Sequence, residues 1–272
     1  MFCTCGLVRS MLYYKEYIKS PSADWVVFIH GAGGSSSIWF NQIKPYKKKF
    51  NILLIDLRGH GKSKDLLQKY YEENYSFENI SQDIIDVLDH LKIEKAHFVG
   101  VSLGTIIIRT LGEIAPERIH SAILCGAITR LNVRSRILVF IGNIFKRVIP
   151  YMLLYRFFAW IIMPRKRHEE SRNLFIREAK KLYQKEFLKW FKLTNEINPL
   201  LRYFKEKEIS TPMLYIMGEE DYMFLPPVKQ IVEKHTSSYL AVVKDCGHVC
   251  NVERPEEFNE LSIKFIEKNA VS

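Results

Sequence analysis

Short apolar runs alternate with amphipathic segments along most of this chain. Six runs are rich in β-branched and aromatic residues and are nearly continuous in apolar character, which is typical of strands buried on both faces. The longer segments between them repeat apolar residues every three or four positions, the spacing of one helix face. The runs predict strands at residues 25–30, 51–56, 96–101, 121–126, 213–218 and 239–244.

The amphipathic segments predict the helices that connect these strands. The strongest pattern covers residues 76–91, where the apolar side chains fall on one face. Strands that alternate with helices are typical of a parallel sheet with crossover helices. Ahead of them, residues 2–5 and 12–17 are predicted to form a hairpin at the sheet edge. We therefore expect an α/β fold with a mostly parallel, doubly wound sheet of about eight strands, and helices at about 36–50, 76–91, 102–114, 227–234 and 255–268.

The alternation of strands and helices breaks once. Residues 128–208 contain no strand pattern, only helix-like segments dense in aromatic residues and arginines. A helical insert late in a parallel sheet predicts a lid over the carboxyl ends of the strands, where ligands bind in open α/β sheets. We expect residues 1–127 and 209–272 to form the core and residues 128–208 to form the inserted lid.

The net charge of +10 is concentrated in this insert. Residues 127–208 hold 19 Lys and Arg against 7 Asp and Glu, whereas the rest of the chain holds 21 against 23. A basic patch spread over a small domain would indicate nucleic-acid binding, but this distribution does not. We expect no nucleic-acid partner, and the basic insert needs its own explanation.

Composition and cysteine usage narrow the class of protein. Apolar residues make up 47% and charged residues 26% of the 272 residues, which excludes a disordered or fibrous chain. No uninterrupted run of eighteen apolar residues occurs, and the first ten residues lack the pattern of a secretory signal. The five cysteines are an odd number without the spacing of a disulfide framework. These features predict a cytoplasmic protein.

The segment GVSLG at residues 100–104 has the context of a nucleophile elbow, because it follows a predicted strand and opens a predicted helix. The sharp turn strains the backbone of Ser102 and requires small residues at 100 and 104. It exposes the Ser102 hydroxyl beside a helix N-terminus, which favours developing negative charge. The alternative is that Ser102 only caps the helix.

A serine nucleophile needs a base that takes its proton. Of the eight histidines, His248 follows the last predicted strand and therefore shares the carboxyl edge of the sheet with Ser102. His60 lies in a glycine-rich loop and is expected to be structural. Zinc binding by Cys246, His248 and Cys250 is disfavoured because these alternating positions lack a fourth ligand.

The base in turn needs a carboxylate that fixes its tautomer. Glu219, Glu220 and Asp221 follow the penultimate predicted strand, and any of them fits by composition. Asp245 precedes His248 closely and is expected to cap its own turn. The chain order of serine, acid and histidine is that of α/β hydrolases.

A site for acyl transfer also needs hydrogen-bond donors for an oxyanion. The segment HGAGG at residues 30–34 follows the first central strand, and its glycines let backbone N–H groups approach a ligand. The alternative, a phosphate-binding loop, is weak because neither GxGxxG nor a Walker lysine is present.

Four ordered motifs resemble the α/β-hydrolase family over nearly the whole chain outside the insert. They are HGAGG at 30–34, DLRGHGKS at 56–63, GVSLG at 100–104, and GEED at 218–221 followed by CGHVCNVERPEEF at 246–258. The resemblance implies that Ser102 is the nucleophile, Asp221 the acid and His248 the base. It also implies that the backbone N–H groups of Ala32 and Leu103 bind the oxyanion. A serine at position 102 distinguishes the chain from the dehalogenase and epoxide-hydrolase branches, which use aspartate there.

The implied activity is hydrolysis of a carboxylic ester, or of a related thioester, lactone or amide, through an acyl-serine intermediate. The partner would be a small-molecule acyl substrate, with no metal and no organic cofactor. Two alternatives stay open. The same triad could cleave C–C bonds or catalyse an elimination, or the protein could be a ligand-binding signalling protein that retains the triad.

Residues 148–163 of the insert are apolar apart from Pro150 and Arg156, and a basic PRKR segment follows at 164–167. One interpretation is a lid helix with its apolar face over an acyl pocket and solvated basic residues outside. The other is a surface that contacts anionic membranes or lipid substrates, because basic amphipathic segments can lie in the membrane interface.

Overall fold

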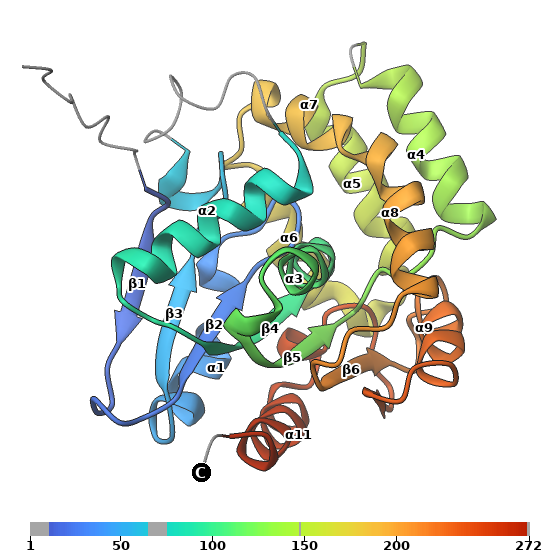
Figure 1. Cartoon of the computed structure of the whole chain (residues 1–272). Coiled ribbons are helices and arrows are strands. Elements are labelled where there is room, and N and C mark those ends of the chain that lie inside the picture. The colour runs from blue at the N-terminus through green and yellow to red at the C-terminus, as the bar shows by residue number, and fades with distance from the viewer. Residues whose placement is uncertain (1–10, 65–74, 147, 271–272) are drawn as a thin grey trace, which may run out of the picture.

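The computed structural model describes residues 11–64, 75–146 and 148–270, which fold around one seven-stranded sheet (Figure 1). The strand order is β1-β3-β2-β4-β5-β6-β7, with β1 antiparallel to β3 and every other pair parallel. The predicted edge strand at residues 2–5 lies outside the described residues. The strands are β1 Tyr14–Tyr17, β2 Trp25–Ile29, β3 Asn51–Ile55, β4 Ala96–Val101, β5 Ile119–Cys125, β6 Met213–Gly218 and β7 Ser238–Val243.

Helices lie on both faces of the sheet and at one end of it. Polar caps help to set where two of them begin: Ser76 Oγ accepts a hydrogen bond from Asn79 N at 3.1 Å, and Asn132 Oδ1 accepts one from Ser135 N at 2.9 Å. The α-helices are α1 Phe40–Lys47, α2 Phe77–His90, α3 Leu103–Ile114, α4 Val133–Phe145, α5 Tyr151–Ile162, α6 Glu169–Ala179, α7 Gln184–Lys192, α8 Thr194–Glu206, α9 Leu225–Val232, α10 Cys250–Glu253 and α11 Pro255–Lys268. Short 3₁₀ helices cover Ser36–Trp39, Gly61–Ser63, Pro116–Arg118 and Lys166–His168.

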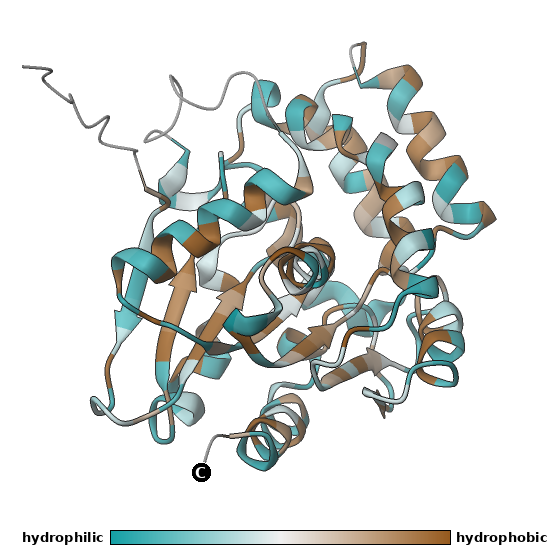
Figure 2. Ribbon diagram, viewed as in Figure 1, coloured by the Kyte–Doolittle hydropathy of each residue, from teal (hydrophilic) through white to brown (hydrophobic). Residues whose placement is uncertain are grey.

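The sheet divides the core into two layers. Because side chains alternate along a strand, Val27 and Ile29 of β2 face the cluster that contains α2 and α3, whereas Val26 and Phe28 face the cluster that contains α1 and α11. Both sides of β2 are therefore apolar, and Figure 2 shows the central strands in brown. This arrangement confirms the predicted α/β class with a mostly parallel, doubly wound sheet.

Between β5 and β6 the described chain contains helices only, from α4 to α8. Figure 1 shows α4, α5, α7 and α8 grouped to one side of the sheet. We call residues 128–208 the helical insert. None of the helices in the described residues is long and apolar enough to cross a membrane.

Candidate active site

Ser102 occupies a strained turn between β4 and α3. Its backbone has φ 54° and ψ −117°, outside the regions that L-residues favour. A Cβ atom at Gly104 would lie 2.5 Å from the Ile29 carbonyl oxygen, so this position requires glycine. A Cβ atom at Gly100 would lie 2.6 Å from the terminal methyl of Ile108 and 3.0 Å from the Gly104 backbone, so a larger residue there would need its neighbours to shift. The Ser102 side chain makes no capping hydrogen bond to the described first turn of α3. The geometry therefore does not fit the capping alternative, and the hydroxyl is directed elsewhere.

The structure brings Ser102, His248 and Asp221 together. His248 Nε2 lies 3.0 Å from Ser102 Oγ, and His248 Nδ1 lies 2.7 Å from Asp221 Oδ2. The Asp221 and His248 side chains are 1% and 5% exposed, so little water competes for these contacts. Because a carboxylate only accepts hydrogen bonds, the Nδ1 proton points to Asp221 and leaves Nε2 free to accept from the serine hydroxyl.

Opposing effects act on the pKa of His248. Burial by itself lowers that pKa, because it disfavours the charged ring. The facing Asp221 carboxylate acts in the other direction through charge and a hydrogen bond, and the net result is a pKa above the usual value of histidine. Asp221 is itself held in place, since its Oδ1 accepts a hydrogen bond from Phe224 N at 3.2 Å. This carboxylate therefore favours the protonated histidine that forms when a serine loses its proton.

The other three candidate acids face away from His248. Glu220 Oε2 lies 2.9 Å from His168 Nε2, and Glu219 Oε2 lies 3.5 Å from the Asp245 backbone N–H. Contrary to the expectation, the Asp245 carboxylate caps no turn among the described residues. It is exposed and contacts Arg167 instead. Only Asp221 of these acids hydrogen-bonds His248 within the described chain.

The loop after β2 lies directly against the Ser102 turn. A Cβ atom at Gly31 would come within 3.2 Å of Ser102 Cβ and 3.8 Å of Leu103 N. Ala32 and Leu103 both line the cavity above Ser102. Their backbone N–H groups hydrogen-bond no acceptor among the described residues, and that of Leu103 opens helix α3. Two donors are thus available beside the serine, as the family resemblance implies.

Two buried histidines hold this loop in place. His30 Nε2 accepts from Leu57 N at 3.0 Å, and His60 Nε2 accepts from Gly33 N at 3.0 Å. Burial and the neighbouring His30 lower the pKa of His60 to about 3, so the ring stays neutral and can accept. The geometry fits the structural role expected for His60. His30 was not singled out by sequence, although it occupies the same kind of position, at a glycine-rich loop after a strand.

A cavity of about 240 Å³ lies over Ser102 and His248. The insert supplies most of its wall, mainly from α4, α5, α6 and α7. Its polar lining includes Glu178, whose carboxylate is held by Ser35 Oγ and Lys181 Nζ, each at 2.7 Å. The rest of the lining from the insert is mainly apolar, so the cavity can hold a substrate with a hydrocarbon part beside the serine. The insert's apolar lining residues are Ile128, Leu131, Leu138, Val139, Tyr155, Phe158, Ile162, Met163, Leu174, Phe175, Phe187, Trp190, Phe191, Leu193 and Ile197.

The outer surface of the insert differs from the expected basic, solvated surface. On α5, the inward Tyr155 and Phe158 line the cavity, but Leu153, Phe157 and Trp160 are exposed. The side of α5 that lines the cavity agrees with the interpretation of a lid helix with its apolar face over a pocket. The outer side carries exposed apolar residues in addition to the solvated basic residues that this interpretation expects.

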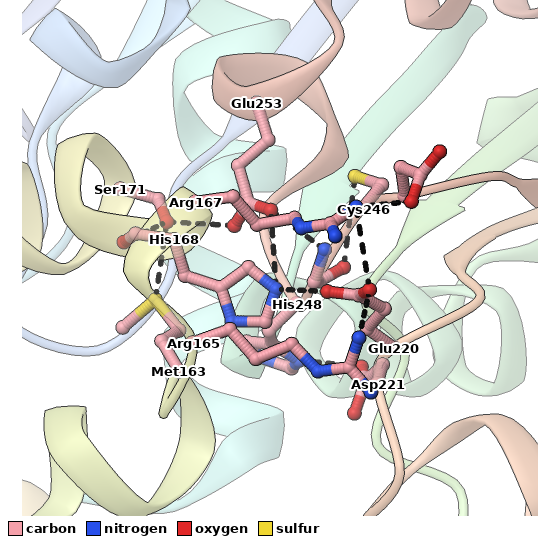
Figure 3. Close-up of polar contacts among 12 residues, drawn as sticks. Met163, Arg165, Arg167, His168, Ser171, Glu220, Asp221, Cys246, His248 and Glu253 are labelled. Atoms are coloured by element: carbon pink, nitrogen blue, oxygen red, sulfur yellow. Dashed lines mark hydrogen bonds and ion pairs between the residues drawn. The ribbon is translucent and has the colours of Figure 1, made fainter.

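A second histidine–carboxylate cluster fastens the insert to the loops that carry Asp221 and His248 (Figure 3). The buried His168 lies 2.9 Å from Glu220 Oε2 and 3.9 Å from Glu253 Oε2. Glu253 also accepts hydrogen bonds from Gly247 N and Ser171 Oγ, each at 2.6 Å. No sequence signal indicated this cluster, because its members come from three segments far apart in the chain.

The sequence matches the model of the alpha/beta hydrolase fold over residues 24–159, which is half of the chain. The chain therefore belongs to the α/β-hydrolase fold family. This confirms the family that the four motifs predicted.

Individual relatives match nearly the whole chain. 3-Oxoadipate enol-lactonase 1 of Acinetobacter baylyi is 25% identical over 256 residues, which are 92% of this chain and 91% of the relative. A putative carbamate hydrolase of Stutzerimonas stutzeri is 26% identical and aligns over 94% of this chain and 96% of its own. The solved structure of a thermophilic esterase from Thermogutta terrifontis is 18% identical with a TM-score of 0.78, and covers 95% of this chain and 94% of its own. That structure shows the shared fold.

Proposed function

We propose that this protein hydrolyses a carboxylic ester or lactone through an acyl-serine intermediate. The observation that carries the proposal is the alignment of Ser102 Oγ, His248 and Asp221, with contacts of 3.0 Å and 2.7 Å. The relatives support it, because an enol-lactonase and a putative carbamate hydrolase are both named for substrates with an acyl carbon bonded to oxygen.

In the proposed first half-reaction, Ser102 Oγ attacks the acyl carbon while His248 Nε2 takes the hydroxyl proton. The carbonyl oxygen becomes an oxyanion, and the N–H groups of Ala32 and Leu103 donate to it. The tetrahedral intermediate then collapses, and His248 gives its proton to the leaving alkoxide. With an ester, the alcohol departs and the acyl group stays on Ser102; with a lactone, the ring opens and the new hydroxyl stays on that acyl group.

In the second half-reaction, His248 takes a proton from water, and the resulting hydroxide attacks the acyl-serine. The carboxylic acid leaves, and the proton returns from His248 to Ser102. Asp221 accepts the Nδ1–H bond throughout and stabilises the imidazolium at each proton transfer. We propose that the helical insert acts as a lid, because its apolar side chains exclude bulk water from the cavity in which these charges develop.

The experiment that tests this proposal is labelling with a fluorophosphonate probe together with hydrolysis of p-nitrophenyl esters. The wild-type chain should be labelled at Ser102 and should hydrolyse the esters. Ser102→Ala should lose the label and lower kcat by roughly 10³-fold or more, while its thermal midpoint stays close to wild type. The control Ser22→Ala, at an exposed serine, should change neither. Labelling at another serine, or more than a tenth of the activity left in Ser102→Ala, would refute the mechanism.

A further inference from the structure

The outer face of α4 carries an exposed apolar stripe. Val133, Ile137, Phe140 and Ile144 are 72%, 51%, 64% and 52% exposed. Their spacing of four, three and four residues places them along one side of the helix. We call these four residues the α4 stripe. Figures 1 and 2 show α4 at the outer edge of the insert, with brown segments along its length.

The opposite face of α4 is fully used by the protein itself. Leu138 is buried and lines the cavity, and Gly142 packs closely against Phe158 and Phe191. A surface helix of a globular protein is normally polar on its outer side. Half or more of each side chain in the α4 stripe is left uncovered by the described chain, and contiguous exposed apolar surface of this kind marks an interaction site.

The stretch of sequence that contains the stripe carries charge of one sign. Residues 128–168 contain nine Lys and Arg and no Asp or Glu. Arg134 and Arg136 flank the α4 stripe, because the helical repeat places Arg134 on one side of it and Arg136 on the other. Both side chains are exposed. Arg134 lies over the Tyr222 ring and Arg136 Nε donates to the Leu131 carbonyl oxygen, and neither arginine forms a salt bridge with a described carboxylate. The surface thus combines an apolar centre with a basic border.

We infer that this face of α4 docks on the surface of an anionic lipid bilayer. Apolar side chains that enter the acyl boundary and basic side chains that meet anionic headgroups are the two components of interfacial binding. A second copy of the chain fits less well, because self-association would bring two basic borders together. Nucleic acid also fits less well, because phosphates would leave the apolar centre of the surface without a partner. This inference does not rest on the proposed hydrolysis.

The test is sedimentation of the full chain with vesicles of phosphatidylcholine alone and of phosphatidylcholine with phosphatidylserine, at low and at high salt. Binding should require phosphatidylserine and should weaken at high salt, because salt screens exposed charges. Ile137→Ser/Phe140→Ser should weaken binding by about tenfold or more, since it removes apolar groups that enter the bilayer. Arg134→Gln/Arg136→Gln should weaken it too and should reduce its salt dependence.

Matched controls distinguish binding by the α4 face from nonspecific hydrophobic or electrostatic binding to vesicles. Ile18→Ser removes an isoleucine of nearly the same exposure, 52% against 51% for Ile137, far along the chain from the insert. Lys229→Gln/Lys264→Gln removes two exposed charges from α9 and α11. Both controls, and Ser102→Ala, should bind vesicles as the wild type does. Circular dichroism melting of every variant confirms that it is folded.

Three results would overturn the inference. The first is no sedimentation with phosphatidylserine vesicles at low salt. The second is binding that the two α4 variants do not reduce in folded protein. The third is a concentration-dependent dimer in sedimentation velocity that Ile137→Ser/Phe140→Ser abolishes, which would assign the stripe to a second copy. A loss of esterase activity has no bearing on any of them, so the two proposals can fail separately.

Discussion

The imidazole of His168 packs against Gly247, the residue that precedes His248. A Cβ atom at Gly247 would lie 2.8 Å from His168 Nε2, and His168 cannot move aside easily because it is buried and bound to Glu220. The insert thereby contacts the loop that carries the candidate base. Through this contact, the packing of the insert bears on the position of His248, with which the described insert residues form no hydrogen bond.

This relationship predicts coupling between the two positions. Gly247→Ala should lower kcat/KM by about tenfold or more, because a shift of the loop by a fraction of an ångström misplaces the base. His168→Ala should cost less by itself, and the double variant should recover part of the loss of Gly247→Ala, because it removes the clash. The check is a double-mutant cycle on ester hydrolysis. Strictly additive losses in log kcat/KM would contradict positioning through this contact.

Asp221 is expected to be the acid that orients His248. Asp221→Asn should lower kcat by roughly 10³–10⁴-fold, because an amide can favour the wrong imidazole tautomer while the fold is kept. Glu219→Gln, Glu220→Gln and Asp245→Asn are matched controls, since each neutralises one nearby carboxylate that does not contact His248. All four variants are to be assayed side by side with one ester. A larger loss in any control than in Asp221→Asn would reassign the acid.

The raised pKa of His248 predicts where activity falls on the acid side. The base must be neutral to take the Ser102 proton, and a raised pKa keeps the ring protonated to a higher pH. The acid limb of the kcat/KM profile should therefore have its midpoint above 6.5, the ordinary histidine value. Asp221→Asn should move that midpoint to lower pH, because it removes the carboxylate that favours the charged ring. A midpoint that is at or below 6.5 in the wild type would speak against this electrostatic assignment.

The apolar cavity predicts a preference for longer acyl chains. Each methylene that leaves water contributes roughly 0.8 kcal/mol, so kcat/KM should rise from acetate to medium-chain p-nitrophenyl esters until the cavity is full. Leu138→Ser, which makes the wall polar, should flatten this dependence. Its control is Ile114→Ser, at an exposed residue of α3 outside the cavity. A strict preference of the wild type for acetate would exclude an acyl pocket.

Two glycines of α3, Gly104 in the elbow and Gly112 outside it, are expected to differ in how much stability they lose when replaced by alanine. Gly104→Ala should lower the free energy of unfolding by about 2 kcal/mol or more, because its Cβ would lie 2.5 Å from the Ile29 backbone carbonyl oxygen. Gly112→Ala should change it by about 1 kcal/mol or less, because the Cβ there meets side-chain methyls of Ile209 and Ile119, of which the close one, Ile209, can move. Urea unfolding of both variants measures the difference, and equal losses would be inconsistent with a rigid elbow.

Most of the sheet could be predicted because its signal is local. A parallel strand covered on both faces must be apolar at every position, so β2, β3, β4 and β6 are visible in any short window of sequence. The predicted strands agree with the structure to within about two residues at each end, and the helix predicted at residues 255–268 coincides with α11 Pro255–Lys268. The elbow around Ser102 was equally visible, since glycines at 100 and 104 reflect steric limits within one turn.

The tertiary structure decided what depends on residues distant in the chain. The sequence placed three acids after β6, but only the path of the loop determines that Asp221 faces His248 while Glu220 turns to His168 of the insert. Likewise, the apolar character of α4 and α5 was evident, but which of their sides would be covered was not. Hydrophobicity is a property of the sequence, whereas burial depends on which partner surface arrives, and α4 has more apolar surface than the described chain covers.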